Sequence, residues 1–297
     1  MPRLTSRDFD PAVLKLFDQY VHGDLSRRGF LDGAARHAAG AGTTAAALLA
    51  ALSPRFAEAQ QVAPNDGRIQ ASRVELPSPK GYGSVKGLLV QPAQAQGKRP
   101  AVLVIHENRG LNPHIEDIAR RLALDNFIAV APDALTALGG YPGDEDKARE
   151  AFGKLDQAKI RQDFLASAAW ARSVAGGNGK LGSVGFCFGG GMVNFLATQV
   201  PELVAAAPFY GPQPAADQVG KIKAELLIVY ASDDDRINAG WPAYEAALKA
   251  AGVRHVAQVY PGTQHGFNND TTPRYDAKSA AQAWSATLAL FNRTLRG

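Results

Sequence analysis

The most restrictive feature of this 297-residue sequence is a regular alternation of strand and helix patterns that begins near residue 69. Short apolar runs such as 101–105 (Ala-Val-Leu-Val-Ile) are separated by longer segments whose apolar side chains recur at helical spacing. Continuous apolar strands are typical of parallel sheets that are buried on both faces. Strand–helix alternation predicts the same architecture. We therefore predict an α/β fold, a mostly parallel sheet with helices on both faces.

The predicted elements can be placed by residue number. We expect strands at residues 69–76, 84–90, 100–106, 127–132, 180–186, 204–209, 225–230 and 254–260. We expect helices at residues 115–126, 147–173, 189–200, 241–251 and 276–295, and the second of these should break near Gly153. A turn sequence at 77–81 (Pro-Ser-Pro-Lys-Gly) joins the first two strands, which predicts an antiparallel pair at one edge.

The first 59 residues follow a different pattern. Paired arginines occur within 26–31 (Ser-Arg-Arg-Gly-Phe-Leu), an uncharged, alanine-rich stretch follows at 38–52, and Ala-Glu-Ala occupies 57–59. This order is typical of an export signal, and it resembles a twin-arginine (Tat) signal peptide. The apolar stretch is too short for a stable membrane span. We predict a Tat signal at 1–59, cleavage after Ala59, a domain at 60–297, the Tat export machinery as a partner, and a periplasmic or secreted location. The alternative is an extension that is never cleaved.

Charge and cysteine content exclude several classes of protein. The formal net charge is only +4 and no run of five like charges occurs, so a nucleic-acid partner is not indicated. A single cysteine, Cys187, excludes an intramolecular disulfide and any multi-cysteine metal site. The six histidines do not form a His-x-x-x-His pattern, so a local metal motif is absent. A small molecule is the expected partner.

Cys187 lies in a motif that favours nucleophilic chemistry. Residues 185–190 (Gly-Phe-Cys-Phe-Gly-Gly) follow a predicted strand and open a predicted helix. A nucleophile on such a sharp turn needs small neighbours, because the turn brings backbones together. The first N–H groups of the helix would also stabilise an oxyanion or a thiolate. The alternative is an inert buried cysteine beside a tight turn.

An acid and a histidine follow downstream in the order that the nucleophile-elbow fold uses. Three aspartates at 233–235 come just after the strand 225–230, and His265 comes just after the strand 254–260. Both would lie at the carboxyl ends of strands, where open α/β sheets bind ligands. The loop 106–110 (His-Glu-Asn-Arg-Gly) follows another buried strand, and in this fold that loop supplies a second oxyanion N–H.

These motifs, together with 131–133 (Ala-Pro-Asp) and 265–267 (His-Gly-Phe), resemble the dienelactone hydrolase family, the carboxymethylenebutenolidases. The resemblance covers roughly residues 70–295. It implies the α/β-hydrolase fold and hydrolysis of an ester or lactone through a Cys–His–Asp triad and a thioester acyl-enzyme. The hydrolysis that it implies requires neither a metal nor an organic cofactor.

The resemblance assigns roles to individual residues. The triad maps onto Cys187, His265 and one of the three aspartates, and we choose Asp234 because the family's acid stands three residues before an aliphatic residue, here Ile237. In the family, a glutamate contacts the resting thiol and helps to generate the thiolate. That role and the two oxyanion N–H groups map onto Glu107, Phe188 and Asn108.

One position departs from the family pattern. The dienelactone enzymes place an arginine four residues after the histidine to bind the substrate carboxylate, and this sequence has Asn269 there. The departure argues against dienelactone itself as the substrate, and the sequence does not place Arg109 or Arg274 relative to the site. Substrate-binding residues therefore stay open. A second hypothesis is a non-hydrolytic binding or thiol redox-sensing protein on the same scaffold, which would need a reactive thiol but no general base at His265.

Overall fold

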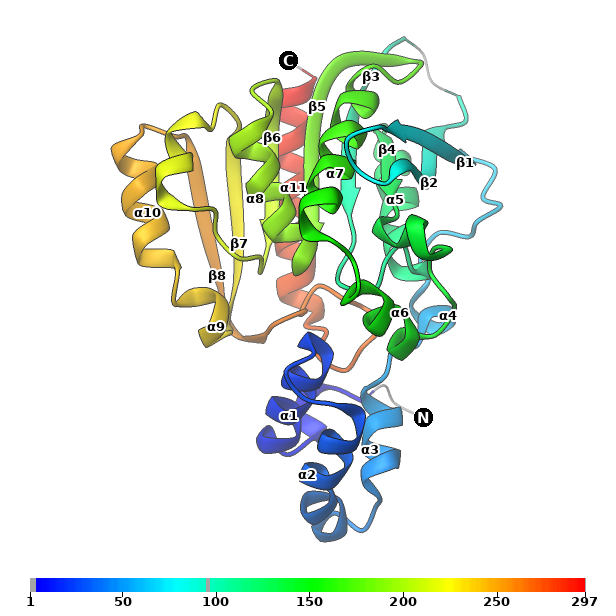
Figure 1. Ribbon diagram of the computed structural model, residues 1–297, viewed down its shortest axis with the longest axis vertical. Coiled ribbons are helices and arrows are strands. Elements are labelled where there is room, and N and C mark those ends of the chain that lie inside the picture. Colours follow the sequence, from blue (N-terminus) through cyan, green and yellow to red (C-terminus); the bar gives the residue numbers. More distant parts are fainter. Residues whose placement is uncertain (1–3, 95–96, 297) are drawn as a thin grey trace.

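The computed structural model describes residues 4–94 and 97–296, which form two parts of unequal size. Residues 60–296, here called the α/β domain, contain the sheet and the helices that cover it. Residues 4–59, here called the N-terminal lobe, are mainly helical, and the helices up to residue 52 lie beyond one end of the sheet (Figure 1).

The described part of the α/β domain contains an eight-stranded sheet in the order β1-β2-β4-β3-β5-β6-β7-β8. The pairs β1–β2 and β2–β4 are antiparallel, and all other neighbours are parallel. The predicted mostly parallel sheet with an antiparallel edge pair is therefore confirmed. The strands are β1 (Ile69–Ser78), β2 (Gly83–Pro92), β3 (Arg99–Ile105), β4 (Ile128–Pro132), β5 (Gly177–Phe186), β6 (Leu203–Phe209), β7 (Glu225–Asp233) and β8 (His255–Gln264).

Helices cover both faces of this sheet, as the alternation predicts. One apolar cluster joins the sheet to α5 (Pro113–Leu124) and α11 (Ala277–Leu295). A second cluster joins the other face to four helices, namely α6 (Glu145–Phe152), α7 (Gln157–Arg172), α8 (Phe188–Gln199) and α10 (Trp241–Ala250). The predicted helix 147–173 does break, because α6 ends at Gly153 and the Asp156 carboxylate caps the start of α7.

The N-terminal lobe is built from three helices with ordinary start and stop signals. It contains α1 (Pro11–His22), α2 (Arg27–Gly40) and α3 (Ala45–Leu52), followed by the short α4 (Phe56–Ala59). Asp10 caps α1, and Gly23 ends it in the left-handed conformation that favours glycine. Ser26 and Thr44 cap α2 and α3.

The lobe has an apolar core of its own, in which the Phe17, Tyr20 and Phe30 rings contact one another. The uncharged stretch 38–52 spans the end of α2 and all of α3, and its Leu49 and Leu52 are buried in that core. Ala59, after which we expected cleavage, is a buried residue of α4. The segment expected to act as a leader is thus a folded part of this structure.

None of the helices in the described residues combines the length and the apolar character that crossing a bilayer would require.

Candidate active site

Cys187 occupies a strained turn between β5 and α8. Its backbone has φ 56° and ψ −114°, and it is one of three non-glycine residues with positive φ in the described chain. Its N–H donates a hydrogen bond to the Phe209 carbonyl at 3.1 Å. Such a conformation persists only where surrounding contacts enforce it, and it is the geometry of a nucleophile elbow.

The glycines around Cys187 are required by close backbone approach. A Cβ at Gly185 would lie 2.3 Å from the carbonyl oxygen of Gly189, and a Cβ at Gly189 would lie 2.2 Å from that of Ile105. Neither backbone contact could be relieved by moving a side chain. The expected need for small neighbours on both sides of the cysteine is met by these two positions.

His265 follows β8 and lies against Asp234, which follows β7. The Asp234 Oδ2 is 2.6 Å from the His265 Nδ1, and both side chains are buried. Asp234 also caps the short helix α9 (Asp235–Asn238), because its Oδ1 accepts a hydrogen bond from the Ile237 N–H. The other two aspartates are exposed; Asp233 bonds to Ser232. Of the three aspartates, Asp234 is therefore the one that the structure brings to His265.

A second histidine, which the sequence analysis did not single out, completes this group. His22, the last residue of α1, places its Nε2 3.7 Å from the Cys187 Sγ and 3.2 Å from the His265 Nε2. The Arg236 guanidinium donates to the same nitrogen at 2.8 Å. The Nδ1 of His22 lies 2.7 Å from the Asp18 carbonyl oxygen. The N-terminal lobe thus contributes a side chain to the centre of the site.

The two histidines change the acidity of the thiol. Burial by itself would raise the pKa of Cys187, but the charge of His265 and the polar contacts with His22 and His265 outweigh it and lower the pKa to about 5. Burial likewise opposes protonation of His265, yet the charge of Cys187 and the bond to Asp234 raise its pKa to about 10. At neutral pH the pair is therefore a thiolate beside an imidazolium.

The loop after β3 lies beside this pair. Glu107 is half-buried, and its Oε2 accepts a hydrogen bond from the Asn269 side chain at 3.0 Å. The Cys187 Sγ contacts His22, whereas Glu107 is held by Asn269, the residue at the departure from the family pattern. His106 is buried; the Ala134 N–H donates to its Nε2 at 3.1 Å, and burial lowers the pKa of its imidazole. His106 is a satisfied polar residue at a strand end.

A cavity of about 420 Å³ opens onto Cys187 and is lined by both parts of the chain. That volume lies within the range of small-molecule sites. Arg274 lines the cavity, stacks over the Phe17 ring and lies 3.3 Å from Asp18. His22 and Tyr20 of the lobe also line the cavity, as do Glu107, Asn108, His265 and Asn269 of the α/β domain.

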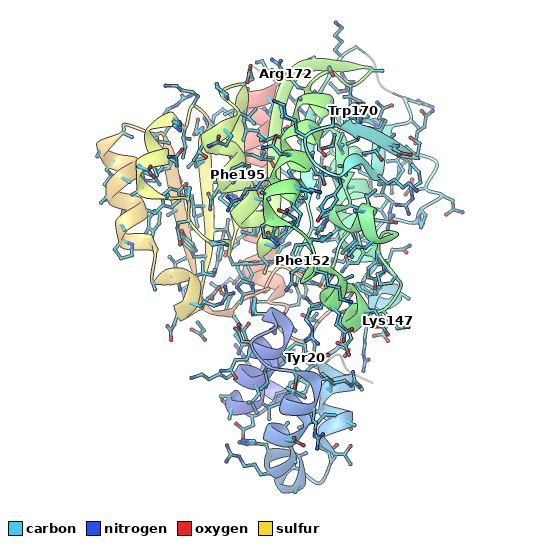
Figure 2. All side chains as sticks on the ribbon, viewed as in Figure 1. Tyr20, Lys147, Phe152, Trp170, Arg172 and Phe195 are labelled. Carbon is cyan, nitrogen blue, oxygen red and sulfur yellow. The ribbon has the colours of Figure 1, made fainter. Side chains whose placement is uncertain are left out.

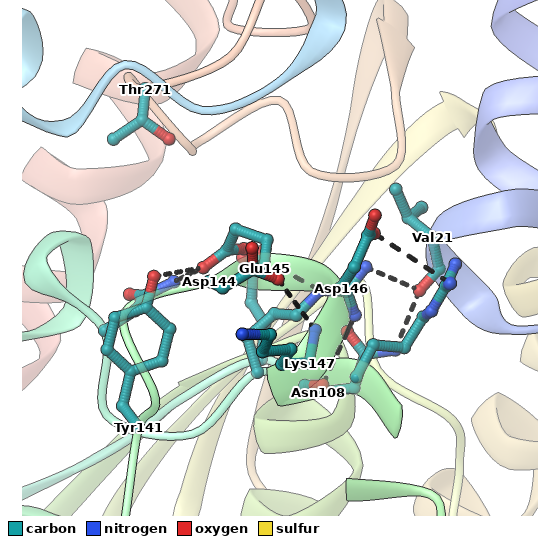
Figure 3. A network of polar contacts seen from close by, with 12 residues as sticks. Val21, Asn108, Tyr141, Asp144, Glu145, Asp146, Lys147 and Thr271 are labelled. Atoms are coloured by element: carbon teal, nitrogen blue, oxygen red, sulfur yellow. Dashed lines mark hydrogen bonds and ion pairs between the residues drawn. The ribbon is translucent and has the colours of Figure 1, made fainter. Parts of the chain in front are cut away.

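Arg109 holds the lobe rather than lining the cavity. Its guanidinium donates to the Val21 carbonyl at 3.1 Å, and the Asn108 side chain donates to the same oxygen at 2.9 Å (Figure 3). Arg149 donates to the Tyr20 carbonyl, and Tyr20 lies at the junction of the two parts (Figure 2). These donors meet the carbonyl end of α1, where cations are favourable.

A comparison with protein families agrees with this geometry. Residues 85–295 match the family described as "Dienelactone hydrolase family". The chain belongs to the dienelactone hydrolase family. It is therefore a hydrolase with the α/β-hydrolase fold, of the carboxylic ester and lactone hydrolase class. Residues 1–39 match a separate family described as "YqhI-like".

Individual relatives match this dienelactone hydrolase family member over different lengths of the chain. A candidate carboxymethylenebutenolidase of Synechocystis is 34% identical over 71% of this chain and 93% of its own. The candidate hydrolase fragment YghX of Escherichia coli K12 is 54% identical over 38% of this chain and 97% of its own. The crystal structure of a candidate dienelactone hydrolase from Klebsiella pneumoniae has a TM-score of 0.68 and 29% identity, covering 76% of this chain and 99% of that one.

Proposed function

We propose that this family member hydrolyses a small carboxylic ester or lactone with Cys187 as nucleophile, His265 as acid and base, and Asp234 as the residue that orients His265. The observation that carries the proposal is the elbow at Cys187 beside a histidine whose Nδ1 lies 2.6 Å from a buried carboxylate. That constellation is what nucleophilic acyl transfer requires. The small-molecule-sized cavity at the thiol supports a compact substrate.

The reaction follows from these positions in two halves. The Cys187 thiolate attacks the substrate carbonyl carbon, a C–S bond forms, and the backbone N–H groups of Phe188 and Asn108 stabilise the oxyanion. As the intermediate collapses, the C–O bond breaks and His265 gives its proton to the leaving alkoxide. Water then attacks the thioester while His265 takes a proton from it. The C–S bond breaks, the acid departs, and the thiolate and imidazolium are restored.

A turnover assay tests the proposal directly. The full chain is assayed against p-nitrophenyl esters and a panel of lactones, with Cys187→Ala as the blank. Turnover that depends on Cys187 supports the hydrolase. Oxidation of Cys187 to a sulfenic acid by peroxide, with no turnover of any ester or lactone, would instead favour the thiol redox-sensing alternative.

Glu107 is proposed to act as a further acid–base group beside the thiolate that attacks substrate. We expect Glu107→Gln to lower kcat by roughly 10²-fold, the usual range for losing a positioned acid–base group. Labelling of wild-type Cys187 with iodoacetamide should fall away as the pH drops through about 5, because only the thiolate reacts. Glu107→Gln removes a negative charge near the thiol, so the pH at which labelling falls away should be lower in this variant than in the wild-type chain.

Glu58→Gln is the matched control. It removes the same charge from an exposed residue of α4 that does not lie at the thiol. Unchanged kcat together with an unchanged labelling profile in Glu107→Gln would make Glu107 a plain loop carboxylate.

We also propose export through the twin-arginine route, which the motif at 26–31 supports. Arg28 is exposed, whereas Arg27 lies 2.6 Å from Asp146 of the α/β domain. Changing both arginines to lysine keeps the ion pair with Asp146, so the double variant should retain its hydrolase activity. We expect it to stay in the cytoplasm while the wild-type chain reaches the periplasm, as measured by cell fractionation. Equal periplasmic levels of the two chains would show that the pair is not an export signal.

A further inference from the structure

His22, Cys187 and His265 form a cluster whose donor atoms meet although the residues are far apart in sequence. The His22 Nε2, the Cys187 Sγ and the His265 Nε2 all lie within 4.8 Å of one another. One ligand comes from the N-terminal lobe and two come from the α/β domain. We propose that these three residues form a binding site for a thiophilic divalent cation such as Zn²⁺, and that its occupancy blocks hydrolysis.

The donor spacing suits tetrahedral coordination. With Zn–N of about 2.05 Å and Zn–S of about 2.3 Å, a tetrahedral site places two nitrogens about 3.3 Å apart and a nitrogen and a sulfur about 3.5 Å apart. The structure has 3.2 Å between the Nε2 atoms of His22 and His265, and 3.7 Å between the His22 Nε2 and the Cys187 Sγ. The third pair, the Cys187 Sγ and the His265 Nε2, lies within 4.8 Å, so shifts of side chains can bring three ligands to one cation. The cavity that the three residues line gives water access to a fourth position.

The outer contacts of both histidines also suit metal binding. Metal-bound imidazoles usually direct their other ring nitrogen to a carboxylate or a carbonyl, which fixes the tautomer. Here the Nδ1 of His22 lies 2.7 Å from the Asp18 carbonyl, and the Nδ1 of His265 lies 2.6 Å from the Asp234 carboxylate. In each histidine the Nε2 is the nitrogen that faces the cluster. Thiolate and imidazole are ligands that Zn²⁺ prefers.

Arg236 competes with a cation for this position. Its guanidinium donates to the His22 Nε2 at 2.8 Å, so it occupies the lone pair that a metal would need. The Arg236 side chain is exposed and can swing into solvent. Coordination also requires an unprotonated Nε2 on both histidines, so His265 releases its proton to solvent when the cation binds.

The inhibitory consequence rests on the proposed function, because a cation bound to the Cys187 sulfur removes the nucleophile and the base together. Binding itself does not depend on that function. A cation would also join the lobe to the α/β domain through His22. Zn²⁺ should therefore raise the Tm of the wild-type chain, since a ligand that binds only the folded state stabilises it.

The test measures the affinity of the full chain for Zn²⁺ alone, by competition with a chromophoric chelator. We expect one Zn²⁺ per wild-type chain, and we expect His22→Gln and Cys187→Ser each to weaken binding by roughly 100-fold or more, beyond the usual effect of losing an outer contact. Arg236→Gln should strengthen binding, because it removes the competing donor and its charge. His255→Gln alters a histidine outside the cluster and should leave the affinity unchanged.

Different outcomes identify different errors. Equal affinity in wild type and His22→Gln would overturn the three-ligand site and leave at most binding by Cys187 and His265. Weaker Zn²⁺ binding in Arg236→Gln would also contradict the three-ligand site. Arg236 is exposed, so this variant tests the site even if His22→Gln unfolds the lobe. Zn²⁺ that binds through the three residues without inhibiting ester turnover would overturn the block on hydrolysis. Failure to find any substrate would count against the proposed function and leave the affinity measurements intact.

Discussion

Replacing Cys187 with alanine is expected to lower turnover of a p-nitrophenyl ester by roughly 10⁵-fold or more, because nucleophile and base act as one unit. Alanine retains the elbow but cannot form the C–S bond of the acyl-enzyme. Its Cβ is no larger than that of cysteine, so the strained backbone at φ 56° should be as well tolerated as in the wild-type chain. The measurement is kcat/KM under conditions where both chains show the same circular dichroism and Tm.

Mass spectrometry supplies the matching control for that variant. A slow ester should leave an acyl adduct on the wild-type chain at Cys187 and none on Cys187→Ala. Turnover of the alanine variant within tenfold of wild type would remove Cys187 from the mechanism, whatever the fold.

The second large effect is expected at His265 and the aspartate that holds it. His265→Ala should lower kcat by several orders of magnitude, and Asp234→Asn by roughly 10⁴-fold, because an amide can hold the imidazole in the wrong tautomer. The buried Asp234 lies 2.6 Å from His265, whereas its neighbours in sequence, Asp233 and Asp235, are exposed. Asp233→Asn and Asp235→Asn are therefore matched controls that should stay within a few-fold of wild type. A larger loss in Asp235→Asn than in Asp234→Asn would contradict the assignment of the acid.

Much of the α/β domain follows from local sequence pattern. Apolar runs, and weak alternation in the first two strands, predicted the strands of the sheet, and helical spacing predicted α5, α8, α10 and α11 to within a few residues. The site was partly predictable for the same reason, because the carboxyl ends of parallel strands lie along one edge and carry Cys187, the aspartates and His265 to it. The three-residue spacing from Asp234 to Ile237 has a physical reason, because the Ile237 N–H donates to the Asp234 Oδ1 and so caps α9.

The role of the N-terminal lobe could not be predicted in this way. Asp10, Pro11 and Gly23 are local signals that would have delimited α1, but they say nothing about where that helix docks. Its position depends on contacts with residues more than eighty positions away, such as Asn108 and Arg109. His22 meets Cys187 across 165 positions, so no spacing rule for metal or catalytic motifs could have found it.

Asn108 contacts the lobe through its side chain and faces the proposed reaction through its backbone. This arrangement implies that docking of the lobe and stabilisation of the transition state are thermodynamically coupled. The Asn108 side chain donates to the Val21 carbonyl at the end of α1, while its backbone N–H is the proposed donor to the oxyanion. Reciprocity requires that a transition-state analogue which stabilises this loop also tightens the docking of α1 by the same free energy. Amide hydrogen exchange in α1 should therefore slow when such an analogue binds, although the analogue itself binds at Cys187.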